Sequence, residues 1–318
     1  MTSSTSNAGL DDTLDDLVSV YMTAHDAEEF IGAAIDSCLA QTHCRLELII
    51  VDDASTDRTV QEVLARDDER VKLIRLTENA GPGVARNAAL EVATGGWLAV
   101  LDADDVMHRR RLSTLLAWSS ANPGHRILVD DSVRWYPHGR DSDDLLGAAV
   151  PSAPRFRDVA ADEWLRRHLG GKPMFRRELL DAGVRYPDFR AGQDTSFLIQ
   201  LAATSGDPIT WVHQPTYLYR FVEGSLSTRT LRRLDEVERM LLDLRSRPCS
   251  DDRIRVAVDM RLAALRDERM LVEVKAAWKS RQLVELSRLV LDGSNWWRLP
   301  LLASASVRTR VRRKNVVG

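Results

Sequence analysis

Three aspartates directly follow an apolar run in the stretch WLAVLDADDVMH, residues 97–108. They are Asp102, Asp104 and Asp105, and the next lysine or arginine is Arg109. Carboxylates this close repel one another, and a buried charge without a partner is costly, so the group requires a cation. Hard divalent cations such as Mg²⁺ or Mn²⁺ prefer oxygen ligands and often share them with substrate phosphates. The spacing therefore predicts a metal and diphosphate site, with a solvated acidic turn or a helix N-cap as the simpler alternative.

A calcium-binding EF-hand loop is excluded as an explanation for these acids. Such a loop starting at Asp102 needs glycine at its sixth position and glutamate at its twelfth. Met107 and Ser113 occupy those positions.

Two further stretches could contribute to the same site. In VDDASTD, residues 51–57, Asp53 or Ser55 can cap the following helix, but capping does not require two adjacent acids. In ENAGPGVARNAAL, residues 78–90, Arg86 falls on the first turns of a predicted helix, where a guanidinium can pair with carboxylates or phosphates. The GPG sequence lacks the GxGxxG spacing of a dinucleotide fingerprint, which argues against a Rossmann dehydrogenase.

The first third of the chain alternates short apolar runs with helix-like stretches. Strands are predicted at 17–22, 46–51, 71–76 and 97–102, and helices at 28–41, 57–67 and 83–93. Strands that are apolar on both faces, with helices between them, are typical of a doubly wound α/β core with a parallel sheet. Ligands of such sheets bind at the carboxyl ends of the strands, where both aspartate clusters fall.

The pattern is less regular further along the chain. Helices are predicted at 109–120, 175–183 and 195–203, strands at 127–136 and 209–221, a long surface loop at 137–162 and long helical stretches over 228–290. Residues 1–16 are polar and predict a disordered tail. Residues 295–318 form a basic, aromatic tail that either solubilises the chain or makes peripheral contact with an anionic membrane surface.

Composition narrows the class of protein. The chain has 318 residues, of which 44% are hydrophobic and 29% charged, as in soluble globular proteins, and its net charge of −3 argues against a general nucleic-acid binder. Cys38, Cys44 and Cys249 show no C-x-x-C spacing, which indicates reduced intracellular thiols. The sequence shows no signal peptide and no apolar run of about 18 residues. We therefore expect a cytoplasmic protein, with peripheral attachment at the inner face of the membrane as the alternative.

The motifs, in this order, resemble those of the family 2 glycosyltransferases, which have the GT-A fold. The matching stretches are 18–42, 47–57, 79–90, 97–105, 191–197 and 217–227. The resemblance covers about residues 17–228 and implies a Rossmann-like, mostly parallel sheet with helices on both faces. It assigns nucleotide-sugar binding to 17–105 and the acceptor and catalytic half to 106–228, and we expect a helical extension over 229–294.

The resemblance also implies an activity and roles for individual residues. The family transfers a sugar from a nucleotide-diphosphate donor with inversion at the anomeric carbon, using Mg²⁺ or Mn²⁺. The residues implied in donor binding are Thr23, His25 and Glu28 around the nucleoside base, Asp53 at the base ring, Arg86 between the base and the acidic motif, Asp102 near the ribose or the metal's water shell, Asp104 on the metal, and Arg220, Ser225 and Ser227 at the diphosphate.

Asp194 matches the aspartate that serves as catalytic base in the family, although on its own it also fits a helix N-cap. Inversion needs one carboxylate to deprotonate the incoming hydroxyl opposite the leaving diphosphate, whose charge the metal stabilises. The chain departs from the family pattern at Gln193, where glutamate is usual, at Thr23, where proline is frequent, and at Val222, where many relatives carry histidine.

Two other classes of function compete with this interpretation. A nucleotidyltransferase would need a basic triphosphate-binding motif near the N-terminus, and no such motif is present before Arg45. A catalytically silent nucleotide-sugar-binding protein would fit Gln193 and Val222. A UDP-sugar is the favoured donor because it is the commonest in the family. The acceptor stays open among glycans, lipid-linked sugars, natural products and peptides.

Overall fold

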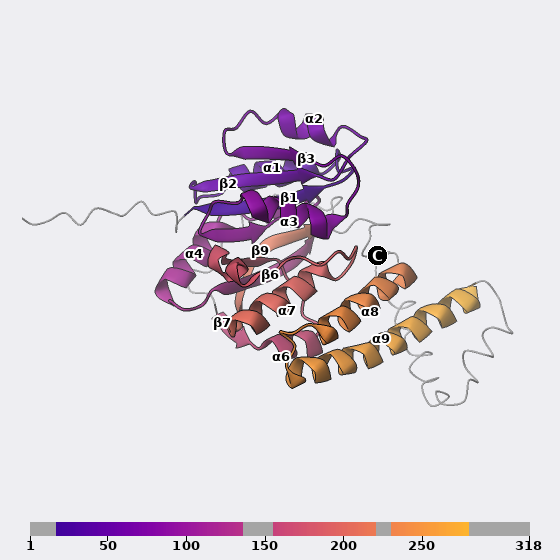
Figure 1. The fold of residues 1–318 in the computed structure, drawn as a ribbon. Coiled ribbons are helices and arrows are strands. Elements are labelled where there is room, and N and C mark those ends of the chain that lie inside the picture. The colour runs from indigo at the N-terminus through magenta and orange to yellow at the C-terminus, as the bar shows by residue number, and fades with distance from the viewer. Residues whose placement is uncertain (1–16, 136–154, 221–229, 280–318) are drawn as a thin grey trace, which may run out of the picture.

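The computed structural model describes residues 17–135, 155–220 and 230–279 (Figure 1). The predicted tails at 1–16 and 295–318 lie outside the described residues, and so do Val222, Ser225 and Ser227.

One sheet of nine strands runs through the described residues. The strands are β1 (Val18–Ala24), β2 (Leu46–Asp52), β3 (Val71–Arg75), β4 (Trp97–Val100), β5 (Val106–Met107), β6 (Ile127–Trp135), β7 (Arg155–Val159), β8 (Pro173–Arg176) and β9 (Ile209–Arg220). The helices are α1 (Ile31–Leu39), α2 (Thr59–Leu64), α3 (Pro82–Val92), α4 (Arg111–Ala121), α6 (Ala161–Arg166), α7 (Gln193–Ser205), α8 (Thr230–Ser246) and α9 (Asp252–Lys279), and Arg177–Ala182 is a 3₁₀ helix.

The strand order shows which edge of the sheet is suited to bind a ligand. It runs β3-β2-β1-β4-β8-β6-β9-β5, and β7 pairs with β9. β1 pairs in parallel with both β2 and β4, with Val20 opposite Leu48 on one side and Ala99 on the other. Because the strand order reverses direction at β1, the carboxyl ends of β1, β2 and β4 border a crevice of the kind that binds ligands in open α/β sheets.

Helices cover both faces of the sheet, as expected for a GT-A fold. Alternate residues of each strand face opposite sides. Tyr21 and Ile49 pack in a core with residues of α3, α6, α7, α8 and α9. Val20 and Leu48 pack on the other face with residues of α1, α2 and α4. The core is therefore two apolar layers with the sheet between them.

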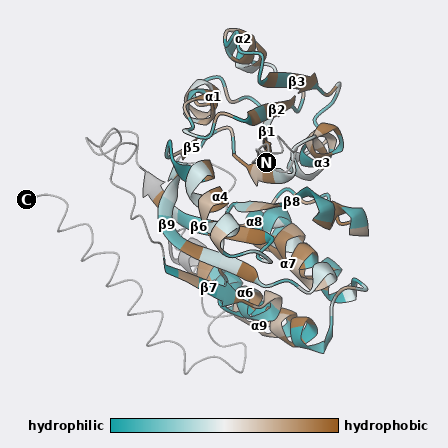
Figure 2. Ribbon diagram, turned by 90° about the vertical axis from the view of Figure 1, so that its left-hand side faces the viewer, coloured by the Kyte–Doolittle hydropathy of each residue, from teal (hydrophilic) through white to brown (hydrophobic). Residues whose placement is uncertain are grey.

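The C-terminal helices pack on the side of the sheet that carries α6 and α7. Contacts join α8 to α7 and to α9, and α9 to α6 (Figure 1). Both hydrophilic and hydrophobic residues occur in α8 and α9 (Figure 2), and the apolar residues Leu234, Leu241 and Leu244 of α8 are buried. Among the described residues, no helix is both long enough and apolar enough to cross a bilayer.

The prediction of a helix at 175–183 was partly wrong. Met174 and Phe175 belong to β8, which is antiparallel to both β4 and β6, and only Arg177–Ala182 is helical, as a 3₁₀ helix ended by Gly183 at φ 79°. Both apolar side chains are fully buried. Pairing with two strands that are distant in sequence overrides the local helical pattern.

The predicted surface loop at 137–162 was also wrong at its end. Residues 155–159 form β7, which pairs with β9, and α6 begins at Ala161, while residues 136–154 lie outside the described residues. The sequence of β7 does not show the apolar pattern of a strand, because four of its five residues are exposed and only Val159 is buried.

Candidate active site

A cavity of about 890 Å³, here called the large cavity, lies at the carboxyl ends of β1, β2 and β4. Most of the residues predicted for the site line it: Thr23, His25, Asp53, Arg86, Asp102, Asp104 and Asp194. Motifs that are far apart in sequence thus meet in one place. The ring of His25 is fixed by a hydrogen bond of 2.8 Å between its Nδ1 and the carbonyl oxygen of Asp53.

Two predicted residues make other contacts and do not line this cavity. Glu28 accepts hydrogen bonds from the backbone N–H and Nε of Arg58, at 2.9 and 3.2 Å. Arg220 supports the acidic turn from behind: its backbone N–H donates to Oδ1 of Asp105 and its Nε to the carbonyl oxygen of Asp104, each at 2.8 Å.

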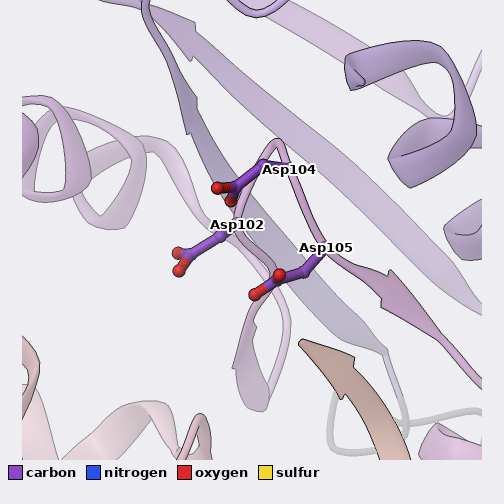
Figure 3. Close-up of side chains that lie close together, drawn as sticks. All are labelled: Asp102, Asp104 and Asp105. Carbon is purple, nitrogen blue, oxygen red and sulfur yellow. The ribbon is translucent and has the colours of Figure 1, made fainter. Parts of the chain in front are cut away.

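The three aspartates gather on a tight turn after β4 (Figure 3). One ligand oxygen from each can be chosen so that all lie within 4.8 Å of one another. Asp105 is fully buried and also accepts a hydrogen bond of 2.8 Å from the hydroxyl of Tyr217. Burial and the charges of Asp102 and Asp104 raise the pKa of Asp105 to about 8. Burial and Asp102 also raise the pKa of Asp104. The turn thus concentrates negative charge that a cation would offset.

The geometry of this turn fits a small divalent cation. Octahedral Mg²⁺ binds oxygen at about 2.0–2.1 Å, so opposite ligands are about 4 Å apart. One oxygen from each carboxylate of the turn can be chosen within 4.8 Å of the others, so the three lie close enough together to face one ion. Within the described residues, the Asp104 carboxylate takes part in no ion pair, whereas Asp105 is engaged by Tyr217 and Arg220. Asp104 is therefore the acid best placed to act as a metal ligand.

Beside the turn, two cations bridge two carboxylates. Arg86 donates from Nη1 to Oδ1 of Asp194 at 2.5 Å and from Nη2 to Oδ1 of Asp102 at 2.7 Å. Lys172 donates from Nζ to Oδ2 of Asp194 at 2.8 Å and also to Oδ2 of Asp102. Burial would raise the pKa of Asp102, but Lys172 and Arg86 outweigh it and lower that pKa to about 2. The four formal charges balance within this cluster.

Lys172 was missed by the sequence analysis. Its side chain is only 13% exposed and lies just before β8. Burial alone would lower its pKa, but the charges of Asp102 and Asp194 raise it above the usual range. No motif marks the stretch GGKPMF, and the partners of Lys172 lie 70 and 22 residues away, so no local pattern could reveal it.

Two sets of contacts hold Arg86 in place, one at the start of its helix and one at its guanidinium group. Asp53 accepts hydrogen bonds from the backbone N–H groups of Ala80 and Gly81, at 2.7 and 2.9 Å, which fastens the loop that enters α3. The guanidinium of Arg86 lies over the ring of Tyr186, 5.2 Å from its centroid. Tyr186 in turn stacks on Phe197 of α7 at 3.9 Å. An aromatic support therefore underlies the charged cluster.

Helix α3 also positions the segment that leads to Asp194. The side-chain amide of Asn87 forms two hydrogen bonds of 2.9 Å with the backbone of Tyr186, one to its carbonyl oxygen and one from its N–H. At Gly83 the two backbones come so close that a Cβ would lie 2.2 Å from the carbonyl oxygen of Pro187. The sequence GVARN therefore places both Arg86 and the approach to α7.

Asp194 lies in the first turn of α7, after Gly192 at φ 84°. Its side chain is 23% exposed. Each carboxylate oxygen accepts one hydrogen bond from a cation, which leaves a second lone pair on each for another donor. Asp194 is thus a carboxylate that a hydroxyl group in the cavity can approach.

Comparisons with known proteins place the chain in a family. The family model described as glycosyl transferase family 2 matches residues 19–186. The succinoglycan biosynthesis protein ExoO of Rhizobium meliloti (strain 1021) is 35% identical over 234 residues, which are 70% of this chain and 66%, just under two thirds, of ExoO.

Solved structures share the fold. The crystal structure of S. aureus TarS 1–349 in complex with UDP-GlcNAc is 18% identical, with a TM-score of 0.59, and the likeness covers 86% of this chain and 80% of the TarS 1–349 chain. The mannosyltransferase PcManGT of Pyrobaculum calidifontis, in complex with GDP-Man and Mn²⁺, is 19% identical, with a TM-score of 0.55, over 92% of this chain and 86% of PcManGT. Together with the family match, these similarities show that the chain belongs to glycosyl transferase family 2 and is a glycosyltransferase with a GT-A fold.

Proposed function

We propose that this glycosyltransferase moves a sugar from a nucleotide-diphosphate donor, preferably a UDP-sugar, to a hydroxyl group of its acceptor, with inversion at the anomeric carbon. The observation that carries the proposal is the joining of Asp102 and Asp194 by Arg86 and Lys172 inside one cavity. Family membership sets aside a nucleotidyltransferase. Residues 17–105 would then serve the donor, and 106–228 the acceptor and catalysis.

Asp104, with Asp102, would hold Mg²⁺ or Mn²⁺. The cluster of hard oxygen ligands supports this assignment, as does the Mn²⁺ in the PcManGT complex. When bound, the metal would supply positive charge that stabilises the leaving diphosphate. Buried Asp105 would support the turn through Tyr217 and Arg220.

Asp194 would act as the general base. It would accept the proton of the incoming hydroxyl as that oxygen attacks the anomeric carbon and the bond to the diphosphate breaks. One base and a direct displacement give inversion, because the nucleophile attacks from the face opposite the leaving group. Arg86 and Lys172 would hold the base in position, since each donates a charge-assisted hydrogen bond to one of its two oxygens.

Thermal unfolding with UDP, GDP or dTDP, each with and without Mn²⁺, tests donor binding. A ligand that binds only the folded state raises the melting temperature, by an amount set by its concentration over Kd. We expect one nucleotide to do so in an Mn²⁺-dependent manner, and Asp104→Asn to remove that dependence. Asp36→Asn, which changes an exposed acid paired with Arg66, is the matched control. No stabilisation by any nucleotide would contradict the proposal.

The anomeric configuration of the product tests the mechanism. Proton NMR of the product from an α-linked donor should show a β-linked sugar. An α-linked product would contradict a single displacement.

A further inference from the structure

A second cavity, of about 180 Å³ and here called the small cavity, adjoins the large one. Gly192, Asp194 and Arg233 line both. The rest of its wall comes from α6 and the turn after it, α7, α8 and α9. Among the residues that the structure describes, Asp194 is the only carboxylate that lines it. A group in the small cavity could therefore reach the proposed base without occupying the part of the large cavity lined by Thr23 and Asp53.

Hydrogen-bond donors dominate the polar wall of the small cavity. The indole Nε1 of Trp164 is buried and finds no acceptor among the described residues. Nε2 of His168 lies 2.9 Å from Nη2 of Arg261, which can only donate. That contact requires a neutral His168 ring with its hydrogen on Nδ1, leaving Nδ1 as a donor. These donors suit an occupant with several acceptor oxygens, such as a sugar.

The backbone at His168 is strained in a way that indicates a use for its side chain. His168 has φ 55°. It occupies the position after α6 where glycine is usual, because its N–H bonds to Leu165 O and the N–H of Leu169 to Trp164 O, each at 3.1 Å. A left-handed conformation disfavours any residue with a Cβ. Strain of this kind persists mainly where a side chain has a function.

The charge around the small cavity is positive. Asp194 is already balanced within its cluster with Asp102, Arg86 and Lys172. Arg261 pairs with Glu268 at 2.9 Å. In the described part of the chain, the half-buried Arg233 has no carboxylate partner. An occupant with an anionic substituent would supply one.

We propose that the small cavity is the acceptor subsite and binds one sugar ring that carries a phosphate group. The ring would lie against Trp164 and His168, the phosphate would pair with Arg233, and a ring hydroxyl would reach Asp194. The small cavity's volume of about 180 Å³ lies below the roughly 300 Å³ of the smallest typical ligand pockets and suits a small occupant such as one sugar ring. This assignment rests on the proposed function, because it uses Asp194 as the base.

Saturation-transfer NMR on the 318-residue protein tests the subsite directly. The probes are the 1-phosphates of glucose, galactose and N-acetylglucosamine, each compared with its methyl glycoside. A saturating concentration of the nucleoside diphosphate that raises the melting temperature, with Mg²⁺, blocks the donor site. We expect at least one sugar phosphate to bind, at least about tenfold more tightly than its methyl glycoside. Binding of none of them, or equal binding of the methyl glycoside, would overturn the proposal.

Variants separate the subsite from the fold. His168→Gly suits the left-handed backbone, so it should fold, and Arg233→Gln changes a half-buried side chain. Each should weaken sugar-phosphate binding at least about tenfold. Arg245→Gln alters an exposed arginine of the same helix that lines neither cavity, and should leave it unchanged. Wild-type binding by His168→Gly and Arg233→Gln would contradict the assignment. Failure of the nucleotide to stabilise the protein would instead count against the proposed function.

Discussion

Lys172 and Asp194 form an ion pair of 2.8 Å at the centre of the site, and the same ammonium group also binds Asp102. The acid after β4 and the acid at the start of α7 therefore share a buried cation. The group proposed to bind the donor and the group proposed to accept the proton are thus linked in one electrostatic unit, which has consequences for both stability and catalysis.

Replacing Lys172 with methionine should reduce stability and activity together. Removing one partner from a buried ion pair leaves uncompensated charge, at a cost of about 3–5 kcal/mol. Asp194 would keep only Arg86 as a cationic partner and lose its position, so kcat should fall. Denaturant unfolding and initial-rate kinetics provide the measurements. Lys172→Arg, which retains the charge, should lose less stability than Lys172→Met, and equal losses would argue against a charge effect.

Asn87→Ala should lower kcat while leaving the KM for the donor nearly unchanged. Asn87 contacts neither cavity but holds the backbone of Tyr186, and so the approach to Asp194, with two hydrogen bonds of 2.9 Å. A small displacement of a catalytic group from its productive geometry can cost a rate factor of about 10². Steady-state kinetics that instead showed only a higher donor KM would contradict a positioning role.

Gly83→Ala should destabilise the fold even though alanine normally stabilises a helix by about 0.5–1 kcal/mol relative to glycine. Its Cβ would lie 2.2 Å from the carbonyl oxygen of Pro187, and such overpacking costs about 1–3 kcal/mol. Urea unfolding measures the free-energy change. Gly170→Ala is the control, because its Cβ would meet no atom within 4 Å and the substitution should be close to neutral.

Acid unfolding should reveal the contribution of Glu47 to stability. This residue is 5% exposed and lies in β2. Burial would raise its pKa, but hydrogen bonds from Lys72, Ser19 and Thr94 lower it from the usual 4.5 to about 2. Because the folded pKa is the lower one, the carboxylate stabilises the protein above pH 4.5, and this contribution disappears as the pH falls towards 2.

Glu47→Gln should therefore lose about 3 kcal/mol of stability at pH 7, with the difference from wild type shrinking at low pH. Urea unfolding of both proteins at a series of pH values measures this difference. A constant difference from pH 7 to pH 2 would show that the charge is not responsible.

The sequence predicted the fold of residues 17–105 well for a physical reason. Each strand there is a short apolar run followed by a helix with its own local signals, so periodicity alone places residues such as Asp53 and Asp102 at strand ends. Parallel strands align those ends, which explains why the acidic motifs meet.

The fold of residues 106–228 was harder to predict because its contacts are not local. Met174 lies in a strand only because β4 and β6 flank it. Lys172 and His168 occupy no recognisable motif, and their roles arise from partners on other elements, Asp102 and Arg261 respectively. Arg220 stays a prediction at the diphosphate, and its backbone N–H and Nε also support the acidic turn, which the sequence did not indicate.

The most direct test of the account is the transfer rate of Asp194→Asn at saturating donor, acceptor and Mn²⁺. Asparagine keeps the shape of the side chain but cannot take the proton, so the rate should fall by about 10²–10⁴-fold. Stabilisation by the nucleotide should persist, because the donor would bind through Asp104 and the residues around Thr23. Transfer at the wild-type rate by Asp194→Asn would show that Asp194 is not the base.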